Sequence, residues 1–150
     1  MSSIFDLFRK IETEKAPPAP VTHIVAGLGN YGREYEGTRH NAGFSAIDIL
    51  SDRKKLSVTR AKFDALTDET VINGKRILVM KPQLYMNLSG VSVKKAADFY
   101  KIPAGNIIVI CDDINLDVGK LRIRRKGSDG GQKGLRNIAE HLGTDAFPRI

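Results

Sequence analysis

The sequence predicts an α/β fold with a mixed, mostly parallel twisted sheet that is flanked by helices. Short apolar runs rich in β-branched residues alternate along the chain with segments whose apolar residues recur at helical spacing. This alternation is typical of helix crossovers between parallel strands. A single Asn-Gly pair between two of the apolar runs predicts a hairpin, which adds antiparallel pairing to the same sheet.

Size and composition predict one globular domain behind a short N-terminal appendage. The chain has 150 residues, of which 41% are hydrophobic and 27% are charged, as in ordinary globular proteins. Residues 1–21 combine one amphipathic helical pattern with a proline-rich linker, so we expect the domain to cover 22–150. No membrane-length apolar run or signal peptide is visible, and the single cysteine suits a reducing compartment. We therefore expect a cytoplasmic protein.

The first strand is expected over residues 23–26, and a glycine-rich loop follows it. The loop begins Gly27-Leu28-Gly29-Asn30-Tyr31-Gly32, which matches the spacing of the dinucleotide-binding fingerprint. In a dinucleotide site, a helix opens directly after the glycines and its N-terminus holds the pyrophosphate. Here a loop containing His40 separates the glycines from the first helical pattern. The sequence therefore disfavours a nicotinamide or flavin site.

Hydrophobic periodicity predicts the remaining elements. We expect helices over 44–56 and 89–100, with Ser89 as the cap of the second, and a last helix that ends near 142. Strands are expected over 63–72, 75–81, 106–110 and 118–125. The second and third of these strands are apolar on both faces, so they should lie inside the sheet.

The positive charge of the chain is concentrated in one stretch. The whole chain carries +7, and residues 120–136 contain seven basic residues against one acidic residue. Alternation in the expected strand 118–125 places Lys120, Arg122 and Arg124 on one side. Such a patch suits a polyanion such as nucleic acid, and the alternative interpretation is a solvated strand face.

Several kinds of chemistry find little support. The chain contains no Gly-x-Ser-x-Gly elbow of a serine hydrolase. Cys111 ends an apolar strand, which favours a packing role over a nucleophilic one. His23, His40 and His141 fall in unrelated contexts, so we expect no metal site.

A water-activating site remains. Asn30, Asn87 and Asp112 follow the ends of expected strands, where open α/β sheets bind ligands, and His40 lies in the first of these loops. His40 can act as the base that activates a water molecule. Asp112 can orient the imidazole and stabilise its cation. The amides of Asn30 and Asn87 can hold the water or a carbonyl oxygen.

These residues lie in motifs that resemble the bacterial peptidyl-tRNA hydrolase family. The resemblance runs from about Thr22 to the last residue, and it rests on Gly27-Leu28-Gly29-Asn30, Tyr35, Thr38-Arg39-His40-Asn41-Ala42-Gly43, Lys81-Pro82, Tyr85-Met86-Asn87-Leu88-Ser89-Gly90, Asp112-Asp113 and the glycine-rich loop 127–134.

The resemblance implies a monomeric enzyme that cleaves the ester of a peptidyl-tRNA into peptide and tRNA without metal or organic cofactor. It makes His40, Asp112 and Asn30 catalytic. It makes Tyr35, Tyr85, Met86, Asn87 and Lys133 substrate-binding, and it gives the basic residues Lys120, Arg122 and Arg124 a role on the tRNA backbone.

The chain departs from the family pattern at several positions. Gln132-Lys133 stands where the family usually has His-Asn, and the missing asparagine normally helps to bind the substrate and its water. Asn115 replaces a commonly acidic residue, and Tyr31 replaces a proline. Family members continue for several tens of residues beyond Ile150, so the resemblance implies that the catalytic domain over residues 22–150 lacks its C-terminal part. The alternative function is a catalytically impaired RNA-binding module of the same fold, similar to relatives that act in organelle RNA splicing.

Overall fold

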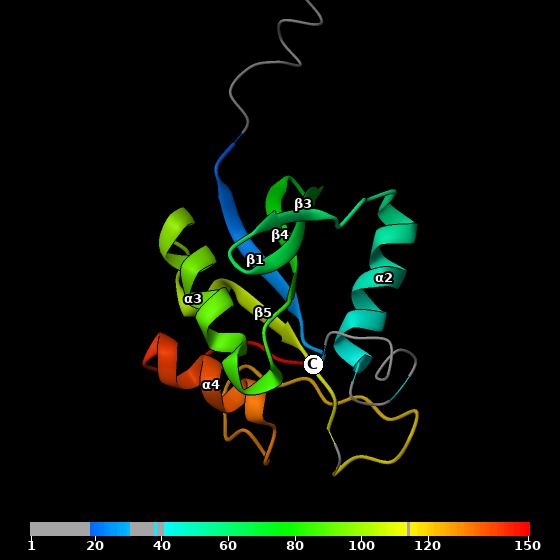
Figure 1. Ribbon diagram of the computed structural model, residues 1–150, viewed down its shortest axis with the longest axis vertical. Helices are drawn as coiled ribbons and strands as arrows, with labels where there is room; N and C mark the ends of the chain where they lie inside the picture. The colour runs from blue at the N-terminus through cyan, green and yellow to red at the C-terminus, as the bar shows by residue number, and fades with distance from the viewer. Residues whose placement is uncertain (1–18, 31–37, 39–40, 114) are drawn as a thin grey trace, which may run out of the picture.

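The computed structural model describes residues 19–30, 38, 41–113 and 115–150, and in this part a five-stranded sheet lies between helices (Figure 1). The predicted N-terminal helix and the side chains of Tyr35 and His40 fall outside the described residues. In chain order the elements are β1 (Val21–Gly27), α2 (Ala42–Lys54), β2 (Arg60–Lys62), β3 (Ala65–Ile72), β4 (Lys75–Pro82), the 3-10 turn η3 (Met86–Leu88), α3 (Ser89–Tyr100), the 3-10 turn η4 (Ala104–Asn106), β5 (Ile107–Ile110) and α4 (Lys133–Leu142).

The sheet is mixed, as the sequence predicted. Its strand order is β2-β3-β4-β1-β5; β1 pairs in parallel with β4 and β5, whereas β2, β3 and β4 pair antiparallel. The predicted hairpin is confirmed, because Asn73 and Gly74 both have positive φ angles, 51° and 76°, and they join β3 to β4. The parallel strands β4, β1 and β5 therefore end at one common edge.

The two faces of the sheet bury different side chains. On β1 and β4, Ile24 and Leu78 face a core shared with α3 and α4, and Val25 and Val79 face a smaller core shared with α2. This explains why the β4 run is apolar on both sides: β4 lies inside the sheet with helices over both of its faces. Figure 1 shows α2 standing apart from α3 and α4 across the strands.

The last residues of the chain run beside β5. The backbone N–H of Val109 donates to the carbonyl of Pro148 (2.9 Å), and the N–H of Ile150 donates back to the carbonyl of Val109 (2.8 Å). The N–H of Cys111 donates to the carbonyl of Ile150 (3.0 Å). Val109 and Arg149 are thus bridged in parallel, and Phe147 is fully buried. The last residues therefore add to the sheet beside β5.

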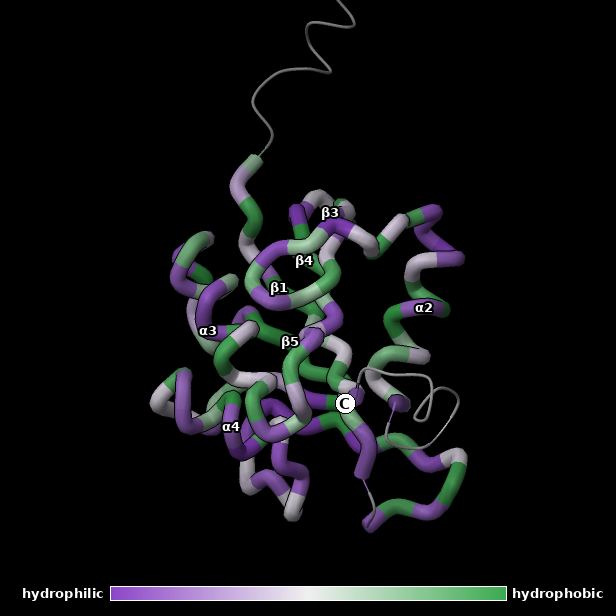
Figure 2. The backbone as a smooth tube through the Cα atoms, in the orientation of Figure 1, coloured by the Kyte–Doolittle hydropathy of each residue, from purple (hydrophilic) through white to green (hydrophobic). Residues whose placement is uncertain are grey.

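The predicted strand over 118–125 is wrong. Within this segment only Arg124 takes part in a β-bridge, an isolated antiparallel one with Arg149. Val118 and Leu121 are each 82% exposed and Ile123 is 72% exposed, so the alternating side chains have no sheet to cover. Figure 2 shows this segment as an outlying loop in which hydrophobic and hydrophilic residues alternate. The period-2 pattern here does not reflect a buried face.

Two smaller predictions also need correction. Ser89 does not cap α3; it is the first helical residue, and its hydroxyl donates to the carbonyl of Met86 (2.7 Å). Phe63 and Asp64 do not begin a strand; they form the turn between β2 and β3 with φ angles of 58° and 54°. The hydroxyl of Ser92 donates to the carbonyl of Phe63 (2.6 Å), and Lys95 forms an ion pair with Asp64. These tertiary contacts favour the turn over the strand that Phe63 suggests.

Gly43, in the first turn of α2, lies directly against the ends of β1 and β5. A Cβ atom at this position would lie 2.3 Å from the nitrogen of Leu28 and 2.3 Å from the carbonyl oxygen of Ile110. These two backbone groups are hydrogen-bonded to each other at 2.8 Å. The neighbours are backbone atoms, which cannot rotate away, so only glycine fits between helix and strands.

We expect Gly43→Ala to lower the free energy of unfolding by about 3 kcal/mol, because the added methyl must push α2 away from the sheet. Gly105→Ala is the matched control, since no heavy atom lies within 4 Å of a Cβ built there. We expect the control to change stability by less than about 0.5 kcal/mol. Urea unfolding followed by circular dichroism measures both, and equal midpoints for the two variants would contradict the packing argument.

Candidate active site

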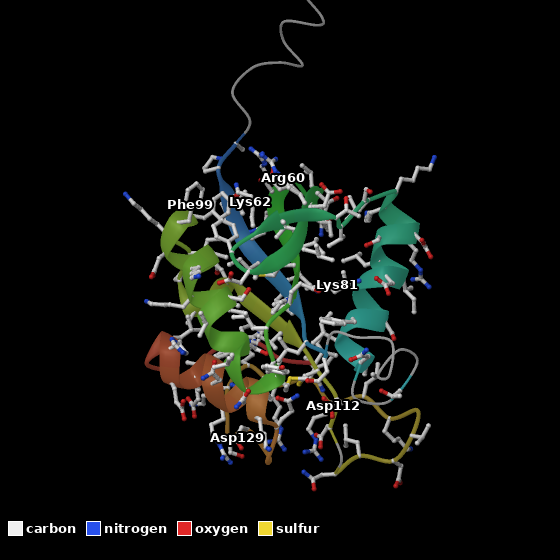
Figure 3. The ribbon with its side chains drawn as sticks, viewed as in Figure 1. Arg60, Lys62, Lys81, Phe99, Asp112 and Asp129 are labelled. Carbon is white, nitrogen blue, oxygen red and sulfur yellow. The ribbon has the colours of Figure 1, made fainter. Side chains whose placement is uncertain are left out.

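A cleft of about 980 Å³ opens where β1, β4 and β5 end. In Figure 3, Asp112 and Asp129 lie at this end of the sheet, and Arg60, Lys62 and Phe99 lie at the opposite end. Every predicted site residue in the described part of the chain lines the cleft: Asn30, Tyr85, Met86, Asn87, Asp112, Lys120, Arg122, Arg124 and Lys133. Residues from four separate segments of the sequence therefore meet in one place.

Asn30 is held at the cleft by a second asparagine, Asn41. The side-chain oxygen of Asn41 accepts a hydrogen bond from the backbone N–H of Asn30 (2.8 Å), and Asn41 is only 5% exposed. Asn41 directly precedes α2, a position that often caps a helix, but its side chain makes no capping bond. It fixes the loop after β1 instead.

Asp112 follows β5 and is linked to the start of α4 through Gln132. The side-chain nitrogen of Gln132 donates to Oδ1 of Asp112 (3.0 Å) and lies 3.3 Å from the sulfur of Met86. The side-chain oxygen of Gln132 accepts from the N–H of Leu135 (2.9 Å), so Gln132 also caps α4. Sequence reasoning missed this role; the available signal was a polar residue one position before a helical pattern.

The glycine-rich loop before α4 is fixed from both ends. Gly130 and Gly131 have φ angles of 59° and 88°, which favour glycine. The carboxylate of Asp129 accepts from the N–H of Gly131 (2.8 Å) and pairs with Arg136 (3.3 Å), and these contacts lower the pKa of Asp129. The side chain of Asn115 donates to the carbonyl of Gly130 (3.1 Å). The loop is thereby tied to the segment that follows β5.

The basic residues lie along the cleft in an irregular segment. Lys120, Arg122 and Arg124 are all exposed, and Arg122 lies 3.7 Å from the carboxylate of Asp113. The segment is anchored at Arg124, whose N–H and carbonyl bond the backbone of Arg149 at 2.9 Å and 2.7 Å. Its cationic side chains face solvent, where they can meet a charged partner.

Arg149 joins the basic segment to the glycine-rich loop. Its side chain is 6% exposed, donates to the carbonyls of Gly127 (2.9 Å) and Asp145, and lies over the ring of Phe147 at 4.2 Å. Burial lowers the pKa of this guanidinium from its ordinary value. Several carbonyl acceptors and an aromatic face compensate for the lost hydration. Sequence reasoning assigned Arg149 no role.

Cys111 lies beside Asp112 but is poorly suited to nucleophilic attack. Burial, followed by the neighbouring negative charge of Asp112, raises the pKa of Cys111 to about 12. The thiolate is the reactive form, and at neutral pH almost none of it is present. The packing role that the sequence favoured agrees with this environment.

A metal site and a membrane-spanning helix each have requirements that the described ranges do not meet. No cluster of three or more His, Cys, Asp or Glu side chains there could hold a metal ion. No helix there combines the length and apolar character that a membrane crossing requires. The cleft offers a carboxylate, amide groups and basic residues, a set that can orient water and bind an anionic, carbonyl-containing substrate.

Comparison with known proteins gives one consistent result. The family model described as peptidyl-tRNA hydrolase matches residues 24–150. The peptidyl-tRNA hydrolase of Clostridium novyi (strain NT) is 50% identical over 127 residues, which cover 85% of this chain and 68% of that protein. The peptidyl-tRNA hydrolase of Clostridium botulinum (strain Hall) is 51% identical over 128 residues, with the same coverage of 85% and 68%.

Solved structures agree with these relatives. The crystal structure of peptidyl-tRNA hydrolase from Acinetobacter baumannii has a TM-score of 0.80 and 36% identity to this chain. The match covers 85% of this chain and 65% of that one. The chain therefore spans about two thirds of the length of the relatives that it matches.

We expect Cys111→Ser to retain most of the activity of the parent protein, because the thiol is protonated at the pH of the assay. Initial rates for the two proteins, each checked for folding by circular dichroism, test this expectation. In the same samples, iodoacetamide should label native Cys111 far more slowly than Cys111 in urea. A folded but inactive variant would revive a thiol mechanism.

Proposed function

Because the chain belongs to the peptidyl-tRNA hydrolase family, we propose that it hydrolyses the ester bond between peptide and tRNA, releasing both. The observation that carries this proposal is that the residues predicted from the sequence of this family member come together in one cleft. The family match spans residues 24–150, and nine residues predicted from the sequence, six of them in the motifs and three in the basic stretch, line one cleft at the strand ends. An ester of tRNA requires polar groups where the bond is cleaved and basic residues where the RNA phosphates lie. The cleft contains both.

In the proposed reaction His40 removes a proton from water, and the oxygen of that water attacks the ester carbonyl carbon. The bond from this carbon to the ribose oxygen then breaks, and His40 returns the proton to the leaving oxygen. Asp112 stabilises the imidazolium that forms between these steps. The amides of Asn30 and Asn87 hold the water and the developing oxyanion.

The remaining cleft residues divide between peptide and tRNA. Tyr85 is 65% exposed and Met86 is half-buried beside it, so both can contact the peptide part of the substrate. We assign the same role to Tyr35. Lys133 lies where the family usually has asparagine; its ammonium group donates hydrogen bonds but accepts none. It can therefore hold a carbonyl or phosphate oxygen, but it cannot accept a hydrogen bond from the attacking water.

We propose that residues 22–150 belong to one catalytic domain, which acts as a monomer without metal or organic cofactor. This agrees with a family match that begins at residue 24 and with a core that is continuous from β1 to Phe147.

Hydrolysis of N-acetylated aminoacyl-tRNA tests the proposal. We expect the protein to release the acetylated amino acid while free aminoacyl-tRNA stays intact, and His40→Ala to lower the rate by about 100-fold or more. Binding of tRNA to the variant, measured by filter binding, should persist, because the imidazole contributes little to phosphate contacts.

Asn106→Ala, at the far end of β5, is a suitable control, since its side chain donates to the carbonyl of Thr22 and does not line the cleft. Hydrolysis that is absent from the parent protein while tRNA still binds would favour the impaired RNA-binding module. Unchanged turnover in His40→Ala would remove this histidine from the mechanism.

Reversing two charges tests the role of the basic segment. We expect Arg122→Glu with Arg124→Glu to weaken tRNA binding and to reduce the slope of log K against log salt by about two, because fewer counterions are released. Cleavage of a minimal ester substrate without most of the tRNA should change much less. Arg53→Glu with Lys54→Glu, on exposed residues of α2 away from the cleft, gives the same change in net charge. Equal salt slopes for both double variants would show that the basic segment is only a solvated surface.

A further inference from the structure

We propose that Gln132 is the positioning residue for Asp112, and that its carboxamide sets the direction in which this carboxylate faces the reacting groups. This inference rests on the proposed hydrolysis, in which Asp112 assists the general base. The family pattern does not supply it, because Gln132 is one of the positions at which this chain departs from that pattern.

The orientation of the Gln132 amide follows from its partners. The N–H of Leu135 can only donate, so the group 2.9 Å from it must be the amide oxygen of Gln132. The amide nitrogen therefore points the other way, toward Oδ1 of Asp112 at 3.0 Å and the sulfur of Met86 at 3.3 Å. Both ends of one side chain are used, so the amide cannot flip without losing both bonds.

The element that carries Gln132 is rigid at this point. Leu135 is buried, and Gly134 packs so closely that an added Cβ would lie 2.7 Å from a methyl carbon of Leu28 and 2.7 Å from the sulfur of Met86. The start of α4 is therefore packed against the loops that follow β1 and β4. A donor on such a support holds its acceptor more precisely than one on a free loop.

The chemistry of the donor also suits the proposed role. A hydrogen bond at Oδ1 restrains rotation of the carboxylate and thereby fixes where Oδ2 faces. The donor is neutral, so Asp112 keeps its full negative charge for the imidazolium; a lysine or arginine in the same place would compete for that charge. Gln132 can thus orient Asp112 without neutralising it.

Two substitutions separate this role from the capping of α4. Gln132→Asn keeps an amide and a good N-cap residue but is one methylene shorter, so it can no longer span from Leu135 to Asp112. We expect kcat to fall about tenfold, with KM within about twofold and an unchanged thermal midpoint. In an Asp112→Asn background, Gln132→Asn should lower kcat by less than about twofold, since the group that Gln132 positions has lost its charge.

Gln132→Glu keeps the length and the acceptor for Leu135 but places a second carboxylate beside Asp112. The added negative charge favours the imidazolium, so the neutral base requires a higher pH. We expect the acidic limb of the pH–rate profile to move to higher pH, which loss of a helix cap alone would not cause.

Three results would overturn the inference: an equal loss of kcat in both backgrounds, an effect confined to KM, or an unmoved acidic limb in Gln132→Glu. The contact can also be tested without turnover. In NMR spectra, the side-chain amide signals of Gln132 should move in Asp112→Ala and stay in place in Asp113→Ala. If the parent protein hydrolyses nothing, the proposed function fails, and this NMR comparison still decides whether Gln132 holds Asp112.

Discussion

The contact between Gly43 and the ends of β1 and β5 is the constraint on which the site depends. One hydrogen bond, from the N–H of Leu28 to the carbonyl of Ile110, joins the two strands at this point, and the first turn of α2 rests directly on it. Asn30 lies two residues after Leu28 in the loop that follows β1, and Asp112 lies two residues after Ile110, the last residue of β5. The spacing of these two polar groups is therefore set by a contact between backbones, which side-chain motion cannot relax.

Strong periodic patterns predicted most of the fold. The β4 run and the Asn73-Gly74 turn carried local signals that agreed with their final environment, and both predictions are confirmed. The segment 118–125 also alternates, but alternation identifies a strand only where one face is buried. Leu121 and Ile123 remain exposed, so burial of their side chains does not stabilise a strand here. The sequence shows the pattern, but it cannot show whether a neighbouring strand is present.

The site residues that lie just after the ends of strands were predictable from the sequence. Asn30, Asn87 and Asp112 could be grouped because parallel strands end at a common edge, and the cleft indeed brings them together. The supporting residues were not predictable in this way. Gln132 contacts Asp112 across 20 positions and Arg149 contacts Gly127 across 22 positions, and neither pair has a local signature. Such contacts depend on how loops pack, which periodicity does not encode.

The two parts of the cleft differ in how firmly they are held, and this difference suits the proposed reaction. Asn30 and Asp112 are restrained by hydrogen bonds to Asn41 and Gln132, on segments that pack against the core. The basic segment is anchored through Arg149, while its own cationic side chains remain exposed. Attack on an ester requires fixed geometry, whereas phosphate contacts act over a longer range and tolerate movement. The buried guanidinium of Arg149 links the two parts, because it holds the carbonyl of Gly127, in the loop that leads to Gln132, while its backbone pairs with Arg124.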